Sequence, residues 1–318
     1  MGHDKLRKFA ENETFSCLLQ PSAQELLADG YFHLRDHAVK GHWNDFFASL
    51  PFGSSPLKTS GYAGPLPSDD GPLPLTKPRV ARFSGGTAET AAPAKGVGLE
   101  LGCGKGEYTI ALAERDPERN YIGVDIKGAR LWKGAKYATE HALPNVAFLR
   151  TRVEFITAFF APGEVSEVWL TFSDPQYRSE NSRLCSPLFL ERYRSFLKPG
   201  GIVHLKTDSR FLHEYARAVC AANNLQVLAC TQDLYGDCRC GIQPVVTEVQ
   251  TFYEQLFLEQ GYPITYLSFV IDHEGPYVSP SDPEQFDSKA WRAAEGPRLL
   301  FGHDSAETRR QKLHAAEE

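Results

Sequence analysis

Three glycines at alternate positions, Gly102, Gly104 and Gly106, follow the apolar stretch 97–101. A helical apolar pattern at 107–113 comes directly after them, so the segment predicts a strand, a sharp turn and a helix. Glycine permits the backbone conformations that a sharp turn needs, and it leaves no side chain between the backbone and a ligand. The turn therefore predicts a site for a nucleotide-like ligand at the end of a strand.

Carboxylates stand at the same kind of position on three later segments. Asp125, Asp174 and Asp208 each come at the end of an apolar stretch of strand composition. Ligands of parallel α/β sheets bind at the carboxyl ends of the strands. We therefore expect these three acids to lie on the same edge of a sheet as the glycine turn.

Strands and helices alternate from residue 97 to 271, which predicts an α/β fold: a doubly wound, mostly parallel, Rossmann-like sheet with helices on both faces. The stretch 231–249 is expected to be a loop. The expected strands are 97–101, 120–125, 146–149, 167–172, 202–205, 226–229 and 264–270. The expected helices are 107–113, 128–139, 153–160, 186–196, 211–222 and 251–259.

The chain divides into four parts by composition. Residues 1–50 form a basic and aromatic extension, which either packs on the domain or acts as a basic arm that touches phosphates; a helix could start near 21–27. Residues 51–96 are rich in proline and glycine, and we expect a disordered insertion because such a segment buries little apolar surface. The α/β domain spans 97–271. Residues 272–318 are expected to be a mobile tail with a short helix near 306–315.

The bulk composition is that of a soluble globular protein. The 318 residues are 42% hydrophobic and 23% charged, with no apolar run long enough for a membrane span and no secretory signal at the start. Seven scattered cysteines favour a reduced, cytoplasmic protein, and the spacing of Cys238 and Cys240 is not a zinc pattern, so no metal is expected. A net charge of -6 argues against a general nucleic-acid coat but permits a local basic patch.

The glycine spacing is one residue tighter than the dinucleotide pattern, and it resembles the first motif of class I S-adenosylmethionine-dependent methyltransferases. The resemblance implies that Gly102, Gly104 and Gly106 carry S-adenosylmethionine. Glu100 would lie near the positively charged amino-acid end of this cofactor, and Asp125 would accept hydrogen bonds from its ribose. The alternative for Asp125 is a cap of the next helix.

Several separated motifs together resemble one family, the bacterial branch of the tRNA (guanine-N7-)-methyltransferases. The resemblance covers about residues 97–271 and reaches an N-terminal motif. The segments that carry it are Leu6–Asn12, Gly123–Trp132, Phe172–Gln176, Phe196–Gly201, Lys206–Asp208 and Thr251–Glu254.

This resemblance implies transfer of a methyl group from S-adenosylmethionine to N7 of a guanine in the tRNA variable loop. Guanine N7 carries a lone pair and no proton, so the reaction needs positioning rather than a general base. Asp174 would be the catalytic residue, contacting the cofactor and accepting hydrogen bonds from N1–H and the amino group of guanine. Asp208, Thr251 and Glu254 would complete the guanine pocket. The partner is then tRNA, with no obligatory protein partner and with the oligomeric state open.

Two departures from the family pattern keep other functions in view. The loop after Asp174 carries only Arg178 and Arg183 as basic residues, which predicts fewer phosphate contacts and a weaker dependence of tRNA binding on salt. Arg152 stands where many members carry an acid near the adenine, so backbone groups at 151–153 would bind that ring. The alternatives are a class I methyltransferase for another RNA base or a small molecule, a scaffold without turnover, and, least favoured, a dinucleotide oxidoreductase.

Overall fold

The computed structural model describes residues 3–28, 33–52, 96–237, 242–282 and 284–295. The described residues fall into two compact units, one ending at Ser281 and the other beginning at Asp282. The second unit contains the 3₁₀ helix η3 (Glu284–Phe286) and helix α10 (Ser288–Glu295). Of the insertion expected at 51–96, residues 53–95 lie outside the described residues, as does the helix expected at 306–315.

An eight-stranded sheet forms the centre of the first unit, in the order β1-β6-β5-β4-β7-β8-β10-β9. The pairs from β1 to β8 are parallel, while β10 runs antiparallel to both β8 and β9. Their bounds are β1 Leu18–Leu19, β4 Val97–Leu101, β5 Tyr121–Asp125, β6 Val146–Arg150, β7 Val165–Thr171, β8 Leu197–Thr207, β9 Val227–Thr231 and β10 Thr265–Val270. The predicted mostly parallel α/β sheet is confirmed.

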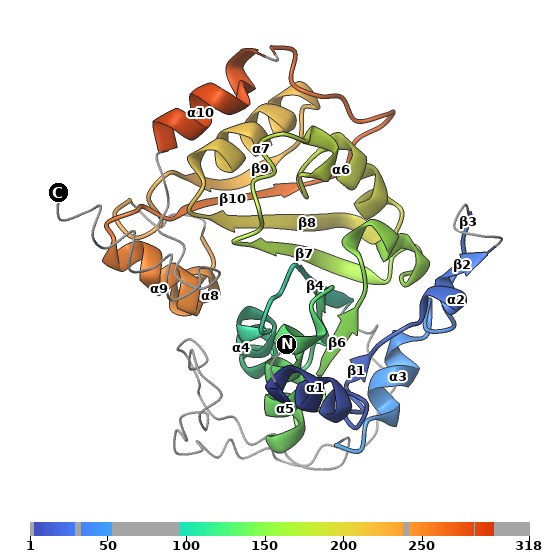
Figure 1. Ribbon diagram of the computed structural model, residues 1–318. Coiled ribbons are helices and arrows are strands. Elements are labelled where there is room, and N and C mark those ends of the chain that lie inside the picture. The colour runs from blue at the N-terminus through green and yellow to red at the C-terminus, as the bar shows by residue number, and fades with distance from the viewer. Residues whose placement is uncertain (1–2, 29–32, 53–95, 238–241, 283, 296–318) are drawn as a thin grey trace. The chain divides into compact units, whose positions relative to one another are not determined.

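Helices cover both faces of this sheet. The helices α4 (Glu107–Arg115) and α5 (Gly128–Glu140) pack on β4, β5 and β6, while α6 (Pro187–Arg194) and α7 (Arg210–Ala222), above β8 in Figure 1, pack on β8 and β10. Strands β4, β5 and β7 are buried along their whole length, as expected for parallel strands covered on both sides. The remaining elements of this unit are α1 His3–Asn12, α2 Ala23–Leu26, β2 Leu27–Ala28, β3 His33–Leu34, α3 Trp43–Ser49, η1 Val153–Ala158, η2 Glu180–Ser182, α8 Pro244–Glu248 and α9 Phe252–Glu259.

The strand order reverses at β4. The chain runs outward from β4 through β5 to β6, and then returns to β7 on the other side of β4. Such a reversal opens a crevice between the loops that leave the two strands, and this is where ligands of open α/β sheets bind. The loops in question are the glycine turn after β4 and residues 172–176 after β7.

Most predicted elements between 97 and 271 are present, with three differences. The strand predicted at 202–205 is longer, since β8 begins at Leu197. The predicted helix at 153–160 is a 3₁₀ helix, η1, and the stretch predicted to be a loop at 231–249 contains the short helix α8. Five residues are too few to show a helical apolar period, which is why α8 escaped the sequence pattern.

The N-terminal segment packs on the sheet and on α5. β1 pairs with β6, with Leu18 opposite Phe148. Asn12 of α1 donates to the carbonyl of Gly128 at 3.0 Å, and the indole of Trp132 donates to Glu11 at 2.7 Å. These contacts support the packing interpretation of the extension. None of the described helices is long and apolar enough to cross a membrane. Within the same described segments, no group of three or more His, Cys, Asp or Glu residues could hold a metal ion.

Candidate active site

The glycine turn has two open positions and one packed position. Gly102, Gly104 and Gly106 have φ values of +78°, +59° and +78°, in the left-handed region that disfavours other residues. A Cβ atom on Gly102 or Gly104 would meet no atom of the described residues within 4 Å, whereas one on Gly106 would lie 2.4 Å from the ring of Phe148. The first two glycines therefore leave bare backbone for a ligand, and the third lets the turn pack against β6.

The buried carboxylate of Glu100 connects the segments that flank the glycine turn. The residue is 2% exposed; Oε2 accepts the amide of Thr109 at 2.8 Å and its hydroxyl, and Oε1 accepts the hydroxyl of Thr171. Burial raises the pKa of Glu100 to about 7, against the lowering effect of these hydrogen bonds. Glu100 thus joins β4, α4 and β7. Its predicted place near the amino-acid end of the cofactor stays a prediction.

Asp125 lies against the turn. Its Oδ2 accepts the amide of Gly104 at 3.0 Å, and its Oδ1 accepts the amide of Lys127 at 2.7 Å. The N-cap position of α5 is Lys127, so the alternative in which Asp125 caps that helix is wrong. Each carboxylate oxygen has a further lone pair, which leaves acceptor capacity for ribose hydroxyls.

Two residues near these loops, Ser173 and Ile126, escaped the sequence reasoning, and Thr151 entered it only through its backbone. The hydroxyls of Thr151, after β6, and Ser173, after β7, are buried and have no hydrogen-bond partner among the residues that the structure describes. Ile126, which follows Asp125, is 52% exposed. Buried hydroxyls without partners are costly, and an apolar side chain beside an acid at a strand end suits a flat ring with polar edges. Their position directly after a strand was the available signal.

Arg152 is more loosely placed. Its side chain is 61% exposed, its Nε lies 4.0 Å from Glu154, and its guanidinium lies 5.9 Å from the centre of the Phe155 ring. Both contacts are with neighbouring residues of the same segment, so the predicted role of Arg152 at the adenine stays a prediction.

The loop after β7 presents Asp174 to solvent between two unusual backbone positions. Phe172 and Gln176 have φ values of +51° and +47°. Non-glycine residues in this region cost about 1–3 kcal/mol, and they persist where their surroundings impose them. The amide of Phe172 donates to the carbonyl of Lys206 at 2.9 Å, and its ring stacks on Phe257 of α9. The conformation of the Asp174 loop is therefore imposed by β8 and α9.

The two arginines of this loop differ. Arg183 is 5% exposed; its guanidinium lies 4.7 Å from the ring centre of Phe211 and 4.3 Å from that of Tyr215, and it donates to the carbonyl of Gln176. Arg178 is exposed. Only Arg178 of this pair can reach a phosphate without breaking the loop.

The other predicted acceptor residues lie beyond β8. Asp208, at the end of β8, is half-buried, and Thr251 is the N-cap of α9, where it accepts the amide of Glu254. Glu254 is fully buried: its Oε1 lies 2.7 Å from Nζ of Lys206 and accepts the hydroxyl of Tyr235 at 2.5 Å. The predicted contacts of Asp208, Thr251 and Glu254 with guanine stay predictions, and for Glu254 the observed partners are protein groups.

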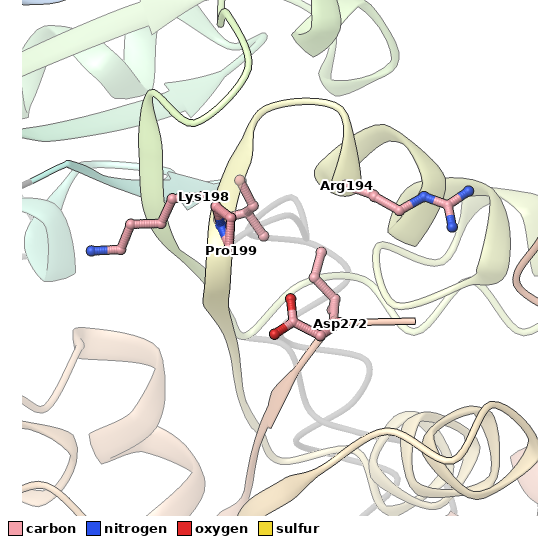
Figure 2. Close-up of a pocket in the computed structure, with 6 residues that line it drawn as sticks. Arg194, Lys198, Pro199 and Asp272 are labelled. Atoms are coloured by element: carbon pink, nitrogen blue, oxygen red, sulfur yellow. The ribbon is translucent and has the colours of Figure 1, made fainter. Parts of the chain in front are cut away.

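A pocket of about 200 Å³ is found elsewhere (Figure 2). It lies at the amino end of β8, at the sheet edge opposite the glycine turn. Asp272 in its wall accepts the amide of Gly200 at 3.1 Å. Its lining residues are Arg194, Leu197, Lys198, Pro199, Ile271 and Asp272. This pocket is not part of the candidate active site.

Comparison with known proteins agrees with this geometry. A family model described as a putative methyltransferase matches residues 94–267. The tRNA (guanine-N(7)-)-methyltransferase of Christiangramia forsetii is 41% identical over 270 residues, which are 84% of this chain and 98% of that protein. The enzyme of the same name from Bacteroides thetaiotaomicron is 50% identical over 182 residues, 57% of this chain and 71% of that protein.

Among solved structures, the 16S rRNA methyltransferase KamB resembles 55% of this chain and 87% of its own, with 15% identity and a TM-score of 0.41, too low to support an argument. The match to the Christiangramia protein is different in kind, because it combines 41% identity with 84% of this chain and 98% of that relative. With its glycine turn and strand-end acids in the arrangement described above, the chain belongs to the tRNA (guanine-N7-)-methyltransferase family.

Proposed function

We propose that this chain transfers a methyl group from S-adenosylmethionine to N7 of a guanine in the variable loop of tRNA. The observation that carries the proposal is the strand reversal at β4, because the open glycine turn after β4 and the loop that presents Asp174 after β7 leave neighbouring parallel strands at the same end of the sheet. Family membership supports the same reaction.

The residues of the first half of the crevice fit S-adenosylmethionine. The bare backbone of Gly102 and Gly104 suits the amino-acid end, Asp125 the ribose hydroxyls, and the unpartnered hydroxyl of Thr151 a polar edge of the adenine. Ile126 would pack on the adenine ring, with Arg152 near it. When bound, this cofactor supplies an electrophilic methyl group on a sulfonium.

The second half of the crevice would orient the guanine. Asp174 is an exposed carboxylate, and guanine presents two neighbouring donors, N1–H and the amino group, on its Watson–Crick edge. A carboxylate that accepts both fixes the ring, so that the N7 lone pair can face the methyl group in line. Asp208, Thr251 and Glu254 would complete this pocket, and Arg178 would contact a phosphate.

The extension adds little net charge for RNA binding. In α1, Arg7 pairs with Asp4 and Glu11, each at 2.7 Å, and Lys8 pairs with Asp4 at 3.0 Å. Since these acids offset the bases, we expect a modest dependence of tRNA affinity on salt. Action in the cytoplasm, without an obligatory protein partner, belongs to the same proposal.

The test is a methylation assay with tritiated S-adenosylmethionine and unmodified tRNA, followed by nucleoside analysis. We expect label in 7-methylguanosine from the variable loop and none in a tRNA whose target guanine is replaced by adenine. Absence of that label, with cofactor binding intact by calorimetry, would contradict the proposal. Label in another base or in a small molecule would favour the alternative acceptor that the sparse basic loop at 176–183 suggests.

A further inference from the structure

The segment 244–254, which we call the strap, contains α8 and the start of α9. One buried side chain of β8 holds it. Nζ of Lys206 lies 2.7 Å from Glu254 Oε1, and it donates to the carbonyls of Val246 at 2.6 Å and Val249 at 2.8 Å. An ammonium has three protons, so the whole hydrogen-bonding capacity of Lys206 is used on the strap.

A second buried side chain ties the strap to the glycine turn. Glu107 is the first residue of α4, directly after Gly106. Its Oε2 accepts the amide of Phe252 at 2.7 Å, across 145 positions of sequence. Phe252 is the first residue of α9, where an amide has no partner within its own helix. Nζ of Lys105, inside the turn, lies 5.0 Å from the centre of the Phe252 ring.

The other contacts of the strap are weaker or shared. Glu254 Oε1, the partner of Lys206, also accepts the hydroxyl of Tyr235 at 2.5 Å, and the side chains of Val246 and Val249 are buried. α8 has five residues and α9 has eight, too short to be stable alone. An ion pair between Arg115 of α4 and Glu248 of α8 also joins the strap to α4, but Nε and Oε2 are 3.5 Å apart and the Glu248 side chain is 57% exposed. Exposed pairs of this kind contribute little. Glu107 and Lys206 are therefore the buried charged side chains that tie the strap to α4 and β8.

We propose that Glu107 and Lys206 are positioning residues, which fix the strap and its N-cap residue Thr251 relative to the glycine turn. The inference rests on the proposed function, because the strap is a wall of the acceptor pocket only if a base is methylated there. The Glu107 tie starts at the first residue of α4, directly after the glycine turn, and the Lys206 tie starts near the carboxyl end of β8. Loosening either would let the acceptor shift while the cofactor site keeps its own contacts, and displacements of about 1 Å can cost on the order of 10²-fold in rate.

The deciding experiment compares Glu107→Ala with Glu107→Gln. The glutamine keeps an oxygen that can accept the Phe252 amide, and alanine does not. We expect Glu107→Ala to lower kcat about 10- to 100-fold and to speed hydrogen exchange at amides 252–254. Its Kd for S-adenosylmethionine by calorimetry should stay within about twofold of the wild type, and Glu107→Gln should stay within about threefold in kcat.

Lys206→Met tests the other tie, which does not touch the glycine turn. We expect a similar loss of kcat, faster exchange at amides 246–249 and an unchanged cofactor Kd. This variant could fail to fold, because Glu254 is left buried without its lysine partner. In that case the comparison of Glu107→Ala with Glu107→Gln still tests the positioning role. Arg115→Ala is the matched control: it removes the exposed link on the same strap, and its kcat should stay within about twofold of the wild type.

The outcomes separate the two proposals. A wild-type protein that binds the cofactor but places no label in tRNA overturns the proposed function. An active wild type with Glu107→Ala above half its kcat overturns the positioning role. So does an equal loss in the alanine and glutamine variants, since only one of them lacks the acceptor.

Discussion

The donor and acceptor sides of the crevice are built in different ways. On the donor side, a short run of sequence around Gly102–Gly106 sets the backbone, and its partners Asp125 and Glu100 accept from amides and hydroxyls at the ends of neighbouring elements. On the acceptor side, buried ties between distant segments hold short helices, as with Lys206 and Glu254. The donor site follows from local backbone geometry, whereas the acceptor site depends on long-range packing that can change without altering cofactor binding.

The largest expected effect is on the acceptor side. Asp174→Ala removes the exposed carboxylate that we propose orients guanine, so we expect kcat for tRNA methylation to fall roughly 10²–10³-fold. Because Asp174 is exposed and its carboxylate accepts the local amide of Gln176, the thermal midpoint should change little. Single-turnover methylation and calorimetry check this. A variant that keeps near wild-type turnover would remove Asp174 from the mechanism.

Two glycine variants separate the packing role of the glycine turn from its proposed role in cofactor binding. Gly106→Ala places a Cβ 2.4 Å from the Phe148 ring at a φ of +78°, so the expected loss is about 2–4 kcal/mol of unfolding free energy. Gly102→Ala has the same φ but open space, so about 1 kcal/mol is expected. Its larger effect should be weaker cofactor binding. Urea unfolding and calorimetry check both variants, and equal losses of stability would contradict the division.

Glu100→Gln tests the role of the buried Glu100 carboxylate through the dependence of the unfolding free energy on pH. Burial raises the folded-state pKa of Glu100 to about 7 from the usual 4.5. The stabilisation by its protonated form is complete below pH 4.5 and is lost as the pH rises through 7. The wild type should therefore lose on the order of 3 kcal/mol of unfolding free energy relative to Glu100→Gln between pH 4.5 and pH 8. Unfolding curves across this range measure that difference, and a constant difference would show an ionised Glu100 throughout.

The smallest expected effect concerns the loop arginines. Arg178→Ala should weaken tRNA binding by less than about tenfold and reduce the salt slope by about one, without changing the thermal midpoint. Arg183→Ala should instead lower the thermal midpoint, because its guanidinium packs on Phe211 and Tyr215 and holds the carbonyl of Gln176. Filter binding at several salt concentrations and thermal melts separate the two. If only Arg183→Ala reduced the salt dependence of tRNA binding, Arg183 rather than Arg178 would be the residue that contacts a phosphate.

The same contrast explains what the sequence could predict. The strand, turn and helix at 97–115 followed from glycine spacing and apolar period, because their causes lie within the segment. The tie from Glu107 to Phe252 has no local signature, since the two residues are 145 positions apart. The burial of the Thr151 and Ser173 hydroxyls had only a weak signal, their position after a strand, because serine and threonine at strand ends more often form turns. The strand pattern singled out Asp174 and Asp208, whereas the resemblance to a family supplied their predicted roles and added Thr251 and Glu254.

The pairing of β1 with β6 has a consequence for how the chain folds. Leu18 lies opposite Phe148, and the amide of Phe148 donates to the carbonyl of Cys17 at 2.7 Å. The strand β1, near the start of the chain, can therefore pair only after the distant strand β6 is available. Such long-range pairing raises the contact order and slows folding. Closing so long a loop costs an entropy that grows only with the logarithm of its length, about 0.6 kcal/mol for each doubling.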